Sequence, residues 1–186
     1  MKSFQTFNDV ISFWAGDAPN ASALFAQGQQ PLTYLGLSEI VLGFREFLSH
    51  AGFSRNDRIA IVHSGGADMA AAMTALACSV TVVPLNTAST VGEFYLHFQD
   101  KKINAIALED GLATNAREAA DKLNIPVLQI KVHSPEIAGN VYLSGEINTE
   151  TRIAPTAAEP DDLLVVFATS GTTSYGKAVP LSHRGV

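Results

Sequence analysis

Short apolar runs alternate with amphipathic stretches over most of this chain. From Ile59 onward the runs are rich in Val, Ile, Leu or Ala, and they lie at Ile59–Val62, Thr81–Leu85, Ala105–Leu108 and Pro126–Val132. The stretches between them carry apolar residues at helical spacing. Strands that alternate with helices are typical of a parallel sheet that has helices on both faces. We therefore expect an α/β fold with a mostly parallel, doubly wound sheet.

The N-terminal part of the chain precedes this alternation. A short helix is expected over Phe4–Trp14, followed by two short strands at Ala23–Ala26 and Leu32–Leu35. From Leu37 the apolar residues fall on one face at helical spacing, and Gly52 follows as a C-terminal cap. This segment is expected to be a helix with a clear end and a less well marked start.

Local signals also mark the later elements. Thr90 and Glu93 have the spacing of a capping box, and the aromatic residues that follow are typical of core filling; they are Phe94, Tyr95 and Phe98. A further helix is expected over Ala113–Leu123. Residues 133–160 are rich in glycine, proline and polar residues, so we expect a long connection with a short possible strand at Asn140–Leu143.

Composition excludes several classes of partner. The chain has 186 residues, 47% of them hydrophobic and 16% charged, with a net charge of −6. Its lysines and arginines are scattered, so neither nucleic acid nor a membrane surface is an expected partner.

Cys78 is the single cysteine and lies in an apolar stretch, which favours a buried small hydrophobe. No secretory signal or membrane-spanning run is visible, so a cytoplasmic location is expected.

The segment from Leu163 to Val186 carries the chemistry. An apolar run ends at Ala168 and leads into a loop of hydroxyl side chains around one glycine, made of Thr169, Ser170, Gly171, Thr172, Thr173 and Ser174. Lys177 adds a positive charge at the far end. Hydroxyls and backbone N–H groups donate hydrogen bonds to anions, and glycine lets the main chain approach closely. The pattern favours phosphate binding.

Two other interpretations of this loop start from its residues alone. Ser, Thr and Gly are ordinary turn residues, so the loop could be a polar turn between strands. Gly171, Gly176 and Lys177 also satisfy GxxxxGK, but Ala178 stands where a P-loop needs a hydroxyl for the metal. Val179 precedes Pro180, which disfavours the helix that a P-loop requires.

The segment TSGTTSYGKAVPLSH resembles the signature loop of the adenylate-forming superfamily, commonly written TSGTTGxPKGVxLSH. The departures are Ser174, Gly176 and Ala178, which stand where the motif has glycine, proline and glycine. LTY at Leu32–Tyr34 and LACSVTVVPLN at Leu76–Asn86 resemble two further elements of the family, in the family's order. The resemblance covers nearly the whole chain, although only the signature loop is specific by itself.

The resemblance implies an enzyme that uses ATP and Mg²⁺ to activate a carboxylic acid as an acyl-adenylate. The acyl group then passes to a thiol, either coenzyme A or a carrier phosphopantetheine. On this template the β- and γ-phosphates would be cradled by Thr169, Ser170, Gly171, Thr172 and Thr173. Lys177 would stabilise the loop and its anionic ligand. No catalytic or metal-binding residue is expected within the chain.

The same resemblance implies an incomplete domain. Residues 1–186 are expected to be a partial N-terminal subdomain of an AMP-binding ligase domain, ending just after the phosphate-binding loop at 169–177. The remaining parts of the family's active site would lie beyond Val186, so the chain alone is expected to be inactive. The alternative is a non-catalytic module that binds a partner or self-associates through an unfinished apolar edge.

Three further sets of polar residues are not assigned to a site. His63 follows a strand and is expected to be an exposed or hydrogen-bonded loop histidine, and His183 is expected to cap or orient the segment after it. Acids precede the last apolar run at Glu159, Asp161 and Asp162, and a solvated approach to a buried strand is the expected role for them.

Overall fold

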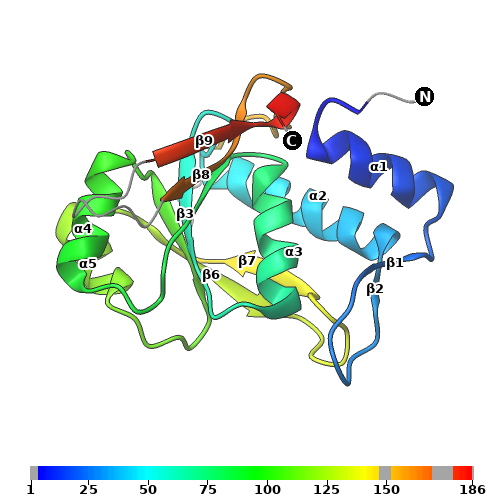
Figure 1. Ribbon diagram of the computed structural model, residues 1–186, viewed down its shortest axis with the longest axis horizontal. Coiled ribbons are helices and arrows are strands. Elements are labelled where there is room, and N and C mark those ends of the chain that lie inside the picture. Colours follow the sequence, from blue (N-terminus) through cyan, green and yellow to red (C-terminus); the bar gives the residue numbers. More distant parts are fainter. Residues whose placement is uncertain (1–3, 147–151, 169–177, 186) are drawn as a thin grey trace.

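A seven-stranded sheet organises the computed structural model, which describes residues 4–146, 152–168 and 178–185 (Figure 1). The strand order is β7-β6-β5-β3-β4-β8-β9. The five central strands are parallel, and β7 and β9 run antiparallel at the two edges. The strands are β3 (Arg58–Val62), β4 (Thr81–Pro84), β5 (Ala105–Glu109), β6 (Val127–Val132), β7 (Val141–Ser144), β8 (Leu163–Ala168) and β9 (Ala178–Ser182).

Helices cover both faces of this sheet. The central strand β3 shows why, because successive side chains point to opposite faces: Ile59 and Ile61 enter one core cluster, and Ala60 and Val62 enter the other. The first cluster contains residues of α2 (Tyr34–His50) and α3 (Gly66–Ala77), and the second contains residues of α4 (Val91–Asp100) and α5 (Ala116–Leu123). The expected doubly wound, mostly parallel sheet is confirmed.

The N-terminal helix α1 (Phe7–Asp17) begins later than the sequence suggested. Thr6 and Asp9 form a capping box, in which each side chain accepts a hydrogen bond from the other residue's backbone N–H. This cap fixes the start of the helix at Phe7. Ile11 is buried against the core, and the ring of Trp14 stacks on that of Tyr34 with centroids 5.8 Å apart.

The start of α2 corrects one expectation. β1 (Ser22–Leu24) and β2 (Leu32–Thr33) pair as a small antiparallel sheet, but the second strand does not continue to Leu35. Thr33 caps α2 instead, because its hydroxyl accepts a hydrogen bond from the Gly36 N–H at 3.1 Å. At the other end Gly52 has φ of +82°, as expected for a glycine that follows a helix.

The second face is built largely as expected. The capping box of Thr90 and Glu93 opens α4, and Phe94 and Phe98 are completely buried. Helix α5 begins at Ala116, later than the expected start at Ala113. The long connection after β6 contains the edge strand β7, close to its expected position. A 3-10 turn, η2 (His183–Gly185), follows β9. No helix in the described segments is long and apolar enough to cross a bilayer.

Candidate functional site

The β8–β9 hairpin carries the predicted phosphate loop. The two strands are antiparallel, with Phe167 opposite Val179 and Ala168 opposite Ala178. The loop that joins them, residues 169–177, lies outside the described residues, and it contains all the predicted site residues, namely Thr169, Ser170, Gly171, Thr172, Thr173 and Lys177. The register of the hairpin brings the two ends of this loop together.

The direction of β8 decides where the loop lies relative to the sheet. β8 runs parallel to β4, so its carboxyl end points to the same edge of the sheet as the carboxyl ends of β3, β4, β5 and β6. In open α/β sheets, ligands bind at this edge, in the crevice where the strand order reverses. The loop therefore leaves the sheet at its ligand-binding edge, and the strand order reverses between β3 and β5.

A polar cluster lies at the point where the strand order reverses, between the ends of β3 and β5. Glu109, at the end of β5, accepts a hydrogen bond from the Ser64 N–H at 2.7 Å and lies 3.5 Å from Nδ1 of His63. The Gly65 N–H also donates to this Nδ1, at 3.1 Å. Burial acts to raise the pKa of Glu109, but the bonds from Ser64 and the attraction of His63 outweigh it, so the pKa lies below its usual value.

Sequence reasoning predicted one part of this cluster and missed another. His63 is a hydrogen-bonded loop histidine, as expected, and its side chain is only 5% exposed. Its contact with Glu109 was missed. The available signal was weak: β3 and β5 had to be recognised as neighbours, because residues that end adjacent parallel strands meet at one edge.

A cavity of about 380 Å³ opens beside this cluster. Its lining is mostly polar or charged and includes Asp68, Glu109, Asp110 and Lys131. Three carboxylates against one ammonium group make this cavity unsuited to a phosphate, because like charges repel. The cavity is therefore distinct in chemistry from the hydroxyl-rich loop.

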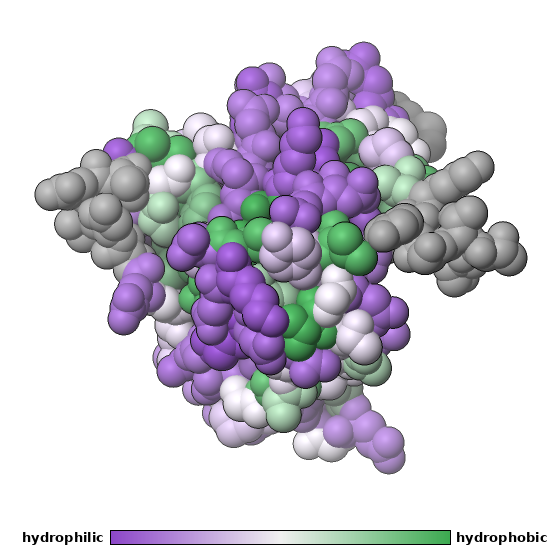
Figure 2. Space-filling model, turned by 90° about the vertical axis from the view of Figure 1, so that its left-hand side faces the viewer, coloured by the Kyte–Doolittle hydropathy of each residue, from purple (hydrophilic) through white to green (hydrophobic). Residues whose placement is uncertain are grey.

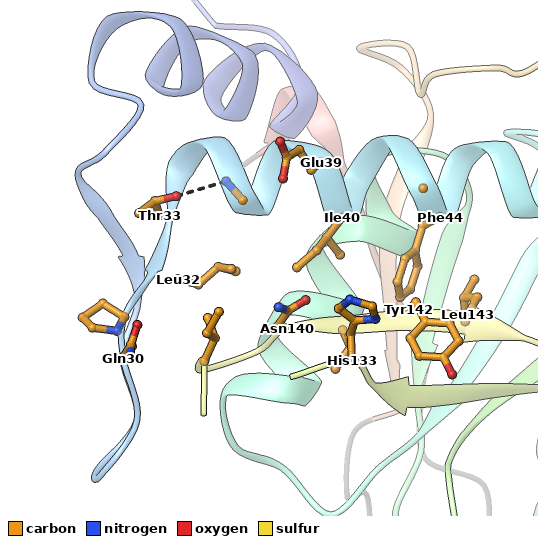
Figure 3. A pocket seen from close by; sticks show the side chains of 15 residues that line it. Gln30, Leu32, Thr33, Glu39, Ile40, Phe44, His133, Asn140, Tyr142 and Leu143 are labelled. Carbon is orange, nitrogen blue, oxygen red and sulfur yellow. Dashed lines mark hydrogen bonds between the residues drawn. The ribbon is translucent and has the colours of Figure 1, made fainter. Parts of the chain in front are cut away.

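A larger groove of about 520 Å³ lies between α2 and β7 (Figure 3). Ile40 and Phe44 form its wall on α2, and His133 and Tyr142 approach from the β6–β7 side. The rings of His133 and Tyr142 meet edge to face, with centroids 6.1 Å apart. No sequence motif pointed to this groove, because its two sides come from distant parts of the chain.

The acidic residues ahead of β8 pair with arginines. Asp162 accepts two hydrogen bonds from Nη1 of Arg55, at 2.8 and 2.9 Å, and Glu159 lies 2.9 Å from the same nitrogen. Asp161 pairs with Arg184 at 3.2 Å. The hydrogen bond that Arg55 donates to Asp162, together with the attraction of Asp162 and Glu159, raises the pKa of Arg55, although desolvation acts to lower it. The side chains of Glu159 and Asp161 are mostly exposed, as expected for a solvated approach, whereas that of Asp162 is only 15% exposed. The arginine partners of these acids could not be inferred from the sequence.

The described residues also bear on two other kinds of site, a metal site and a nucleophilic cysteine. In residues 4–146, 152–168 and 178–185, no group of three or more His, Cys, Asp or Glu residues is arranged to hold a metal ion. Cys78 is fully buried, and burial raises the pKa of its thiol to about 12, although the nearby Arg45 acts in the opposite direction. A thiol of this kind is not ionised at neutral pH, so Cys78 is the buried hydrophobe that was expected.

Comparisons with known proteins agree with this architecture. The sequence model of the family described as "AMP-binding enzyme" matches residues 12–186. The chain is 28% identical to a probable CoA ligase of Humulus lupulus, with 96% of this chain and 34% of the relative covered. It is 29% identical to an oxalate–CoA ligase of Arabidopsis thaliana, again over 96% of this chain and 35% of the relative.

A solved structure of a long-chain-fatty-acid–CoA ligase from Archaeoglobus fulgidus superposes with a TM-score of 0.72 at 18% identity, covering 98% of this chain and 38% of that one. The chain thus spans about a third of the length of the relatives it matches. The match of the family model extends from the middle of α1 through the β8–β9 hairpin, so this chain belongs to the AMP-binding enzyme family.

Proposed function

We propose that this chain is the N-terminal part of an ATP-dependent ligase that activates a carboxylic acid, and that residues 169–177 hold the phosphates of ATP. The observation that carries the proposal is the hairpin of β8 and β9, which presents the family's signature loop at the carboxyl edge of a parallel sheet. Family membership and similarity to CoA ligases support the same assignment.

The donor set of the loop fits a polyphosphate. Hydroxyls of Thr169, Ser170, Thr172 and Thr173, together with backbone N–H groups, would donate hydrogen bonds to phosphate oxygens. Lys177 would add a positive charge. ATP, as the substrate, supplies the adenylyl group and pyrophosphate as the leaving group. Donors fixed around the phosphates reduce the repulsion between a carboxylate nucleophile and the anionic triphosphate.

The rest of the proposed reaction extends beyond these residues. The curated relatives named above are CoA ligases, which favours coenzyme A as the thiol acceptor, with a carrier thiol as the other choice. Among the described residues, no group of three or more His, Cys, Asp or Glu is arranged to hold Mg²⁺. We expect the isolated 186-residue polypeptide neither to form an adenylate nor to bind ATP tightly.

The test is carboxylate-dependent pyrophosphate exchange by the intact protein that contains this chain. Lys177→Ala should lower the exchange rate on the order of 10²-fold, the usual cost of removing a group that stabilises developing charge. Lys122→Ala is the matched control, because Lys122 is an exposed lysine on α5 that pairs with Glu118 at 2.8 Å. Exchange that survives Lys177→Ala unchanged would contradict the assignment of the loop.

The second candidate function is self-association through the β8–β9 edge. Phe167 and Val179 are opposite each other there, and they are 40% and 39% exposed. On the face that Figure 2 shows, hydrophobic residues are interspersed among hydrophilic ones. If the intact protein shows no exchange with a broad panel of carboxylic acids, sedimentation at several concentrations should show whether Phe167→Ser abolishes a dimer.

A further inference from the structure

His183 joins three segments of the fold. It follows β9 directly, and its side chain is buried beneath α1, with the residue only 3% exposed. Its Nδ1 accepts a hydrogen bond from the Phe7 N–H at 3.2 Å, and the two rings meet edge to face with centroids 6.4 Å apart. Its own backbone N–H donates to the carbonyl of Asp162 at 3.1 Å. The first amide of α1 is therefore bonded to the end of the β8–β9 hairpin.

This hydrogen bond requires a neutral imidazole. Nδ1 can accept from Phe7 only while it carries no proton, which leaves the single ring proton on Nε2. Nε2 is buried and makes no hydrogen bond of good geometry with the described residues, although the backbone carbonyl of Ala77 lies near enough to favour a proton on the ring. Burial lowers the pKa of His183, while the backbone carbonyl of Ala77 and the carboxylates of Asp162 and Asp9 act to raise it and are outweighed.

Protonation would break the contact. A proton on Nδ1 would face the N–H of Phe7, so that two donors would meet with no acceptor between them. The new charge would also be buried, and the two carboxylates that face it, Asp9 and Asp162, are already engaged. Asp9 accepts from the backbone of Gln5 and Thr6, and Asp162 accepts from Arg55 and from the Glu159 N–H.

We propose that His183 is a pH-sensitive positioning residue, a latch that holds the start of α1 against the end of β9 while it is neutral and releases it when protonated. The residues that form the latch, Phe7 and His183, are 176 positions apart in sequence. The latch rests on the described fold alone, so it stands or falls independently of the ligase activity.

The direct test is the hydrogen-exchange protection of the Phe7 amide in the wild-type chain, followed by NMR as a function of pH and corrected for intrinsic exchange. Opening of the latch is coupled to uptake of one proton. Below about pH 6.5, the usual pKa of histidine, the protection factor should therefore fall about tenfold per pH unit until the pKa of the latched ring is reached. The His183 ring signals should show the same lower midpoint. Protection that does not change between pH 7.5 and the acid unfolding of the whole chain would overturn the proposal.

Two variants sharpen this test. His183→Gln keeps an acceptor near the Phe7 N–H but removes the titration, so the protection factor of Phe7 should become independent of pH. His133→Gln is the matched control, because His133 is exposed at the β6–β7 side and should leave the wild-type profile intact. Trp14, the only tryptophan, lies on α1 and reports by its fluorescence whether each variant keeps the helix packed. If His183→Gln does not fold, the wild-type titration decides alone.

Discussion

At the scale of single residues, Gly139 occupies a position where the fold leaves no room for a side chain. Its φ is +71°, and a Cβ added there would lie 2.8 Å from the backbone carbonyl oxygen of Ala67. Its N–H donates to Asp68 at 3.1 Å, which ties the turn before β7 to α3. Because the obstructing atom belongs to a helix backbone, it cannot move aside cheaply.

Gly139→Ala should therefore destabilise the chain by more than the roughly 1–2 kcal/mol that a left-handed conformation costs a residue with a Cβ. Gly28→Ala is the matched control: its φ is +77°, but an added Cβ there meets nothing within 4 Å. Urea denaturation of both variants measures the difference. Equal losses in the free energy of unfolding would show that the contact with Ala67 contributes nothing.

At the scale of one element, α2 contains two glycines, Gly36 in its first turn and Gly43 in its interior, and both line the groove against β7. A Cβ added at Gly43 meets nothing, whereas one added at Gly36 would lie 3.0 Å from Cδ1 of Leu32. Gly43→Ala should raise the free energy of unfolding by about 0.5–1 kcal/mol, because alanine loses less backbone entropy in a helix.

Gly36→Ala serves as the comparison for that helix. Gly36 lies in the first turn, where the gain in helix propensity is smaller, and an added Cβ would make a close contact with the buried Leu32, so we expect a smaller increase or a net loss. Thermal unfolding of the two variants decides the matter. A larger gain for Gly36→Ala than for Gly43→Ala would be inconsistent with the packing of α2.

At the scale of the whole molecule, stability should depend on pH in two ranges. The pKa values of His97 and His183 are lowered, first by burial, so the unfolded chain binds these protons more readily than the folded one. Their contribution is fully present above about pH 6.5 and is lost as the pH falls toward the folded pKa values. The pKa of Glu109 is lowered from 4.5, so its contribution is lost only at more acidic pH.

Chemical denaturation between pH 8 and pH 4 checks this expectation. The free energy of unfolding should be nearly constant above pH 7 as far as these groups are concerned, and it should decline below about pH 6.5. The double variant His97→Gln, His183→Gln should show a shallower decline between pH 6.5 and 5. A decline of unchanged steepness in that variant would assign the acid sensitivity to other groups.

Much of the fold followed from patterns within a few residues. The apolar run at Ile59–Val62 predicted a strand buried on both faces, and Thr90 with Glu93 predicted the start of α4. One boundary that was predicted wrongly, between β2 and α2, depends on a competition between strand pairing and a helix cap. Tyr34 and Leu35 were expected within a strand, but Thr33 ends β2 and its side chain caps α2, so both residues begin the helix. Propensity alone does not decide such a competition between a strand end and a helix cap.

The sequence by itself determined the doubly wound α/β class and, through the signature motif, the family. The phosphate-binding role of residues 169–177 stays a prediction. Only the tertiary structure decided which strands are neighbours, and with them the pairs that meet at the sheet edges. His63 meets Glu109 because β3 lies beside β5, and Arg55 meets Asp162 across 107 positions of sequence. The physical reason is the separation of the residues along the sequence. Periodicity and capping act between residues a few positions apart, whereas these contacts depend on the order of strands in the sheet.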